Sequence, residues 1–202
     1  MSRRGSGRGR VNRRASALVV LIALAALAAV FVVPVVDRVV RDLSFPLQDT
    51  SIINRQAAVE HIDPALVAAV IYAETKFDPR TSSAGALGLM QIEPATARNL
   101  AHMSGGTLFK VADLAHPATN IAYGSYYLRY LLNQFNDDKL LALAAYNAGE
   151  TNVDAWVSRV TAKHQRFTVS DIPITQTRLY VAEVMSKQSA YRSHYASQLG
   201  YR

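Results

Sequence analysis

The hydrophobic positions of the chain follow three different patterns. Residues 15–36 form an apolar run without a charged side chain, residues 37–48 mix charged and apolar side chains, and from residue 49 onward apolar positions recur at helical spacing. Residues 49–202 show no sustained alternation of polar and apolar positions and no Asn-Gly or Asp-Gly hairpin signal. The pattern predicts one all-α domain over residues 49–202, preceded by an appendage.

Capping and turn-forming residues mark where the helices of this domain begin and end. Asp63 followed by Pro64 is an N-cap with proline at the first helical position, and Thr151 is expected to cap a later helix. Gly124 falls on the buried stripe of its helix, where we expect it to let a neighbouring backbone approach closely. Uneven loop lengths favour an orthogonal arrangement over an up-and-down one. Helices are predicted at residues 50–62, 64–74, 94–103, 117–135, 140–146, 151–160 and 174–195.

The apolar run of residues 15–36 is long enough to cross a bilayer as a helix, which takes about 20 residues. Residues 1–14 contain six arginines and no acidic residue, an excess that favours a cytoplasmic N-terminus and an external domain. The alternative is a signal peptide, because Ala26-Leu27-Ala28 resembles a cleavage site. Since the apolar run continues beyond that point, we expect an uncleaved anchor with a linker over residues 37–48. Cleavage would instead export the chain.

The formal charge of +7 is concentrated at the N-terminus. Without the six arginines of residues 1–14, 16 basic residues remain against 15 acidic ones, so the domain has no charge excess that would suit a nucleic acid. The chain has no cysteine, which excludes disulfides, thiolate metal sites and a cysteine nucleophile. Its five histidines are scattered, with no pair at metal-ligand spacing. We expect neither a metal nor an organic cofactor, and no nucleic-acid partner.

Glu74 is the first candidate for chemistry. It follows ten residues of mostly Ala, Val, Leu and Ile at the end of a predicted helix. A carboxyl group that emerges from an apolar surface loses solvation, which raises its pKa and favours the protonated form needed for a general acid. The alternative is an ordinary helix-terminal glutamate bonded to the next loop.

The Ser/Gly-rich loop after Glu74 adds polar groups close to this carboxyl. Ser83 offers a hydroxyl, Gln91 offers a donor and an acceptor, and Met90 offers a soft apolar surface, a mixture suited to the amide and the faces of a sugar. The alternative is a connector in which Leu89 and Met90 only fill the core.

Two later segments carry further polar side chains. Tyr146 and Asn147 end an apolar helix, where the phenol could bond to the reacting acid or to a sugar; the alternative is a capping Asn beside a packed Tyr. Gln176 and Tyr180 lie on the polar face that opens the last helix, a weak signal when taken alone.

Together these segments resemble the lytic transglycosylase domain of the soluble (SLT-type) family, which is related in fold to goose-type lysozymes. The resemblance covers about residues 55–190. The family joins a catalytic Glu, a Ser-Pro-Ala-Gly-like loop, Gly-Leu-Met-Gln, Asn-Ile with a downstream Gly and Tyr-Leu, and Ala-Tyr-Asn-Ala-Gly. The matching residues are Glu74, Ser83 to Gly85, Gly88 to Gln91, Asn120-Ile121 with Gly124 and Tyr127-Leu128, and Ala145 to Gly149.

The chain departs from the family pattern at two positions. Thr75 replaces the Ser that usually follows the catalytic Glu, which keeps the hydroxyl on a stiffer side chain. Gln176 replaces a Glu that often precedes the Thr-Arg pair of the last motif. The loss of that charge would remove one influence on the pKa of the acid and one sugar contact.

The resemblance implies a lysozyme-like, orthogonal helical fold and cleavage of the β-1,4 bond between N-acetylmuramic acid and N-acetylglucosamine in peptidoglycan, forming 1,6-anhydro ends. It implies that Glu74 is the lone acid and base, in a cell-envelope protein anchored in the cytoplasmic membrane with its domain outside. The alternatives are a hydrolytic muramidase on the same fold, and a noncatalytic module that holds glycan strands for a cell-envelope assembly machine, which only Gln176 favours. The implied substrate-binding residues are Thr75, Ser83, Gly88, Leu89, Met90, Gln91, Tyr146, Asn147, Gln176 and Tyr180.

Overall fold

The computed structural model describes residues 8–162 and 164–201, and the chain separates into two compact units, one up to Ser44 and one from Phe45. The first unit contains helix α1, Arg8–Ser44. Within it, Ser16–Val36 is a 21-residue stretch that is apolar and exposed, long enough to cross a bilayer. A signal sequence near an N-terminus has the same length and composition, so the anchor stays a prediction.

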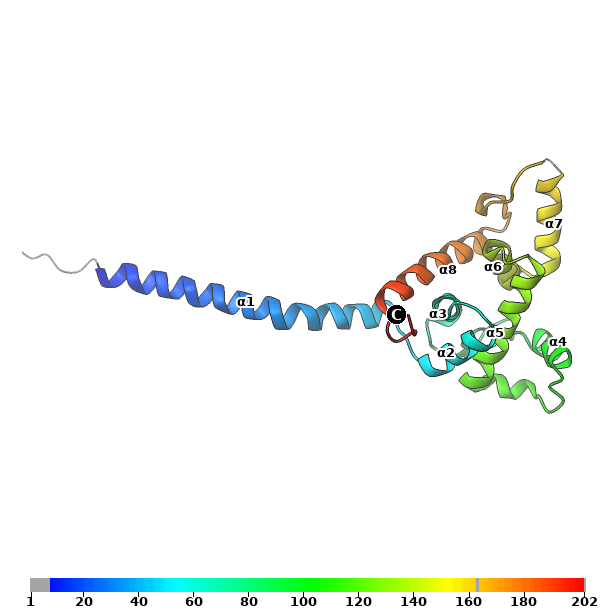
Figure 1. Cartoon of the computed structure of the whole chain (residues 1–202), viewed down its shortest axis with the longest axis horizontal. Coiled ribbons are helices and arrows are strands. Elements are labelled where there is room, and N and C mark those ends of the chain that lie inside the picture. The colour runs from blue at the N-terminus through cyan, green and yellow to red at the C-terminus, as the bar shows by residue number, and fades with distance from the viewer. Residues whose placement is uncertain (1–7, 163, 202) are drawn as a thin grey trace, which may run out of the picture. The chain divides into compact units, whose positions relative to one another are not determined.

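The second unit is built from helices (Figure 1). Its described residues also include one small hairpin. The helices run in several directions around α3, and the prediction of an all-α domain is confirmed. The hairpin pairs β1 (Arg80–Thr81) with β2 (Leu87–Gly88) in antiparallel register. The helices are α2 Thr50–Val59, α3 Pro64–Thr75, α4 Pro94–Ser104, α5 Pro117–Gln134, α6 Lys139–Ala148, α7 Glu150–Thr161 and α8 Thr175–His194, with 3₁₀ turns at Val111–Ala115 and Val169–Asp171.

Helix α3 is the central element of the second unit. Seven consecutive residues, Ala65 to Ile71, are buried, so α3 packs against neighbours on all sides rather than along a single stripe. Its main partners are α8 and α2. As predicted, Asp63 caps its N-terminus, where the carboxylate accepts a 2.9 Å hydrogen bond from the Ala65 N–H. This burial fixes the direction in which the last turn of α3, with Glu74, leaves the core.

The same Asp63 carboxylate connects α3 to the C-terminal part of the chain. It accepts hydrogen bonds from Gln188 and Arg192 of α8 and from the hydroxyl of Tyr201. Burial alone would raise its pKa, but these bonds outweigh burial and lower it. The ionised carboxylate of Asp63 therefore holds α3 and α8 together, at the end of α3 that is remote from Glu74.

The first residues of the second unit are held by two tyrosines. Tyr195 donates a hydrogen bond to the Phe45 carbonyl and Tyr191 donates one to the Pro46 carbonyl, both at 2.7 Å. Lys187 lies 4.2 Å above the centre of the Phe45 ring. The spacer predicted at residues 37–48 is thus helical up to Ser44, and its last residues already belong to the compact unit.

Two predicted helix boundaries are wrong. Helix α2 ends at Val59 rather than at residue 62, because His61 adopts a positive φ of 53° that breaks the helix. Helix α7 begins at Glu150, and Thr151 lies exposed in its first turn instead of capping it. The N-cap is Gly149, whose φ of 86° and ψ of 147° suit glycine and join α6 directly to α7.

Candidate active site

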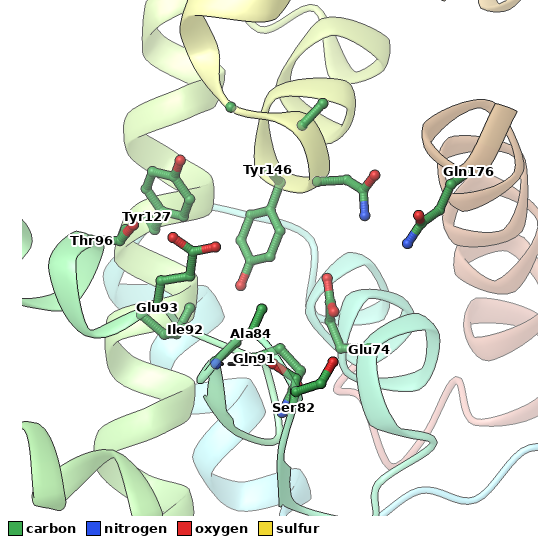
Figure 2. A pocket seen from close by; sticks show the side chains of 15 residues that line it. Glu74, Ser82, Ala84, Gln91, Ile92, Glu93, Thr96, Tyr127, Tyr146 and Gln176 are labelled. Atoms are coloured by element: carbon green, nitrogen blue, oxygen red, sulfur yellow. Dashed lines mark hydrogen bonds between the residues drawn. The ribbon is translucent and has the colours of Figure 1, made fainter. Parts of the chain in front are cut away.

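A cleft of about 520 Å³ lies where α3, the β1–β2 hairpin, the middle of α5 and the ends of α4, α6 and α8 meet (Figure 2). Glu74 and Gln176 stand on one side of it, Glu93, Thr96 and Tyr127 stand on the other, and Tyr146 lies between them. The lining residues are Glu74, Ser82, Ser83, Ala84, Ala86, Gln91, Ile92, Glu93, Thr96, Tyr127, Tyr146, Asn147, Ala148, Gly149 and Gln176.

Glu74 occupies the last turn of α3 and is half-buried. Burial raises the pKa of its carboxyl from 4.5 to about 7, and the Tyr180 hydroxyl and the Arg80 charge offset part of that rise. Arg80 also donates a 2.9 Å hydrogen bond to the Glu74 carbonyl, which fixes the helix end to the hairpin. The carboxyl can therefore hold a proton at neutral pH and release it, as a group that acts as acid and then as base requires.

Tyr180 belongs to the surroundings of the acid rather than to the cleft wall. It is buried, and its hydroxyl has no hydrogen bond of standard geometry within the described part of the chain. The hydroxyl nevertheless lies close enough to Glu74 to lower the pKa of that carboxyl. Tyr180 is absent from the residues that line the cleft, so the structure does not support the predicted sugar contact.

The hairpin presents two serines to the cleft. Ser82 is engaged in the turn, where its Oγ accepts a 3.0 Å hydrogen bond from the Ala86 N–H. Ser83 is exposed and lines the cleft, and its hydroxyl makes no hydrogen bond to any residue that the structure describes. Ser83 is therefore the hydroxyl of this turn that is open to a ligand, and its contact with a sugar stays a prediction.

Gly88 does not contact the cleft, contrary to prediction. Its φ is +75°, and a Cβ atom there would lie 2.2 Å from Nδ2 of Asn120 and 2.6 Å from the Leu114 carbonyl oxygen. Asn120 fills this space because its amide donates to the carbonyls of Leu87 (2.8 Å) and Leu114 (3.0 Å) and accepts from the Met90 N–H (2.7 Å). Gly88 therefore leaves room for the Asn120 side chain. The three hydrogen bonds of Asn120 form the polar centre around Gly88 that fixes the shape of the loop.

Three further predictions of sugar contacts are wrong. Leu89 and Met90 are buried in the core, at 2% and 0% exposure, so the alternative in which both fill the core applies. Thr75 is also buried, and its hydroxyl donates to the carbonyls of Ile71 (3.1 Å) and Leu89 (2.8 Å). These side chains hold the loop against α3 and do not face a ligand.

Gly124 makes room for Met90 rather than for a neighbouring backbone. A Cβ atom at Gly124 would lie 2.3 Å from the Met90 sulfur. The flexible thioether of Met90 therefore fills the space left by the missing side chain of Gly124, which holds the loop against α5.

The remaining predicted residues line the cleft. Gln91 donates to the carbonyls of Arg80 (2.7 Å) and Gly88 (2.8 Å), so its amide oxygen is left for a ligand. Tyr146 donates to the Met90 carbonyl at 3.0 Å, which places its ring at the centre of the cleft but occupies its proton. Asn147 accepts from Thr177 at 2.8 Å.

Gln176 lies in the first turn of α8, exposed at the edge of the cleft and on the same side as Glu74 (Figure 2). The sequence did not single out Glu93, Thr96 or Tyr127, although Tyr127 belongs to one of the family segments. They reach the cleft because α5 packs against β2 and α4 packs against α5. Among the described residues, no group of three His, Cys, Asp or Glu side chains could hold a metal ion.

Comparison with known sequences assigns the domain. Residues 51–168 match the sequence model of the transglycosylase SLT domain family. The chain belongs to the SLT domain family. It is 33% identical over 162 residues to the soluble lytic murein transglycosylase of Salmonella typhimurium, a match that covers 76% of this chain and 24% of that protein. It is 30% identical over 161 residues to the membrane-bound lytic murein transglycosylase C of Haemophilus influenzae, covering 68% and 45%.

Solved structures agree with this assignment. An inactive mutant of the lytic transglycosylase Slt from Pseudomonas aeruginosa superposes with a TM-score of 0.71 at 31% identity, covering 78% of this SLT chain and 26% of that one. The 70-kDa soluble lytic transglycosylase of Escherichia coli gives 0.71 at 30% identity, covering 80% and 28%. The predicted lysozyme-like fold is confirmed. The chain spans about a quarter of the length of the soluble relatives it matches.

Proposed function

We propose that this SLT-family chain is a peptidoglycan lytic transglycosylase that cleaves the β-1,4 bond between N-acetylmuramic acid and N-acetylglucosamine without consuming water. The observation that carries the proposal is the position of Glu74. It is a carboxyl with a pKa of about 7 at the wall of the cleft, in a fold shared with lytic transglycosylases.

In the proposed reaction Glu74 acts twice. As an acid it gives its proton to the glycosidic oxygen while the acetamido oxygen of the muramic acid attacks the anomeric carbon, so the glycosidic bond breaks. As a carboxylate it then takes the proton of the sugar 6-hydroxyl, whose oxygen attacks the anomeric carbon and releases the acetamido group. The proton returns to Glu74 and a 1,6-anhydro ring closes. Because the nucleophile belongs to the substrate, no second protein carboxylate is needed.

The other cleft residues would bind and orient the sugars. Ser83 is placed to orient the acetamido group, and the amides of Gln91, Asn147 and Gln176 offer hydrogen-bonding groups to the glycan. Tyr146 supports the site by holding the Met90 carbonyl, and with it the loop that carries Gln91.

Activity should depend on pH through Glu74. The first step of the proposed reaction needs the protonated carboxyl of Glu74. The release of soluble fragments from purified sacculi should therefore fall as the pH rises above about 7, the pKa of that carboxyl. The measurement is the initial rate of fragment release between pH 5 and 9. A rate that keeps rising through pH 8 would exclude Glu74 as the acid, and binding to sacculi with no release at any pH would identify a noncatalytic module.

We further propose that α1 tethers the domain to the cytoplasmic membrane with the domain on the outer side. The exposed apolar stretch Ser16–Val36 and the arginines that precede it support this orientation. The full-length protein should stay in the membrane fraction after a high-salt wash and should keep its N-terminal residues, as read by mass spectrometry of the intact chain. A soluble product that begins near Ala28 would show cleavage instead.

A further inference from the structure

The cleft contains a second carboxylate that the proposed reaction does not use. Glu93 stands at the N-cap position of α4, directly before Pro94, yet its side chain makes no capping hydrogen bond. Its side chain is exposed, and within residues 8–162 and 164–201 its carboxylate makes no hydrogen bond or ion pair. Figure 2 shows it across Tyr146 from Glu74, beside Thr96 and Tyr127.

The ionisable side chains among the described residues that line the cleft include acids and no bases. Its described lining residues include two carboxyl groups, Glu74 and Glu93, and no Lys, Arg or His. Glu74 holds a proton for much of the time at neutral pH, so Glu93 is the main fixed charge facing a bound glycan. An exposed carboxylate without a protein cation is available to a cation carried by the ligand.

Tyr127 gives this side of the cleft an aromatic surface next to that charge. Burial raises the pKa of its hydroxyl, and the charges of Glu150 and Glu93 raise it further, which places both carboxylates within electrostatic range of the ring. A carboxylate beside an aromatic face is a combination that binds an ammonium group.

We propose that Glu93 is a specificity-determining residue that favours glycan strands carrying a primary ammonium group next to the cleaved bond. The inference rests on the proposed function. The sugar that reacts must keep its acetamido group, since that group is the nucleophile. The ammonium therefore belongs to a neighbouring sugar that lacks its N-acetyl group, or to the free amino group of a peptide branch. Both sources present the same chemistry to Glu93.

The experiment compares four substrates with the full-length protein in detergent. The first pair is peptide-free glycan strands, partly deacetylated or fully acetylated. The second pair is fully acetylated strands with peptide branches whose amino groups are free or chemically acetylated. The variants are Glu93→Gln, which removes the charge at constant shape, and Asp154→Asn, which removes the same charge on α7 outside the cleft lining. The readout is kcat/KM for formation of anhydro products.

The wild type should prefer at least one ammonium-bearing substrate over its acetylated partner by about fivefold, the upper range for an exposed ion pair. Glu93→Gln should remove this preference, and Asp154→Asn should keep it. Glu93→Lys should reverse it. Salt at about 1 M should weaken it in the wild type.

The outcomes separate the two proposals. Preference in one substrate pair assigns the source of the ammonium, and preference in both supports the shared chemistry. Equal rates of anhydro product formation by the wild type within both pairs would overturn the inference and leave the proposed function standing. The inference would also be overturned if Glu93→Gln slowed all four substrates alike, because Glu93 would then bind a group that all four share, such as a sugar hydroxyl. If no anhydro product forms on any substrate, the proposed function itself fails.

Discussion

Replacing Glu74 by glutamine should abolish bond cleavage and leave the fold intact. The amide has the shape of the carboxyl but cannot give up a proton, so both the acid step and the base step are lost. We expect the rate of release of soluble peptidoglycan fragments to fall by about 10³-fold or more. The matched control is Glu183→Gln on the exposed face of α8, which should keep wild-type activity. Full turnover by Glu74→Gln would remove the basis of the proposed mechanism.

The same variant should be more stable than the wild type at neutral pH. Folding raises the pKa of Glu74 from 4.5 to about 7, so the folded chain binds this proton more tightly than the unfolded chain. The resulting loss of stability is absent below pH 4.5, grows up to about pH 7 and stays constant above. Glu74→Gln avoids this loss, so its free energy of unfolding should exceed that of the wild type by about 1 to 3 kcal/mol at pH 7.5.

That stability difference tests the burial of the carboxyl independently of activity. Thermal unfolding of both proteins should be followed at pH 4, 6 and 7.5. The melting temperatures should diverge as the pH rises, with the variant the higher of the two. A constant difference across this range would mean that the carboxyl titrates as an ordinary exposed glutamate.

Asn120→Ala should cause the second largest effect, on stability and activity together. The substitution removes three hydrogen bonds and leaves the buried Met90 N–H and the Leu114 carbonyl unpaired. The Leu87 carbonyl keeps the 3.0 Å hydrogen bond that it accepts from the Ile92 N–H. We expect a loss of about 2 kcal/mol in the free energy of unfolding, since these two buried unsatisfied groups each cost on the order of 1 kcal/mol. Activity should fall as well, because the loop that carries Gln91 loses its support.

The control for this prediction is Asn152→Ala on α7. Asn152 is exposed, and its amide donates to the Ala148 carbonyl at the end of the preceding helix, so its replacement should change the melting temperature little. If Asn120→Ala melts like Asn152→Ala, the polar centre around Gly88 does not support the loop.

The local signals of the sequence predicted the framework and part of the site. Asp63 and Pro64 marked the start of α3, and the apolar run after them placed Glu74 at the edge of the core. The turn residues around Ser83 marked a loop that does face the cleft. These predictions succeeded because capping chemistry and helical periodicity depend on residues that are close together in the chain.

The direction of side chains within the loop could not be predicted. From Gly88 to Gln91 the chain has no helical or strand periodicity, so a sequence motif does not tell which side chains face the ligand. Only Gln91 does, while Met90 packs against Gly124 of α5, a distant partner. In α8, helical periodicity also gave a wrong expectation, since it placed Gln176 and Tyr180 together on a polar, ligand-facing side of the helix. Gln176 and Tyr180 share a helix face four residues apart, but the core covers only the second.

The product of wild-type digestion tests the central claim most directly. Purified sacculi should be incubated with the full-length protein, and the released fragments should be analysed by mass spectrometry without prior reduction. Attack by the sugar's own 6-hydroxyl predicts muramic acid ends in the 1,6-anhydro form, lighter by one water than the hydrolysed fragments and resistant to borohydride. Fragments with reducing ends would contradict the account and identify the protein as a hydrolytic muramidase.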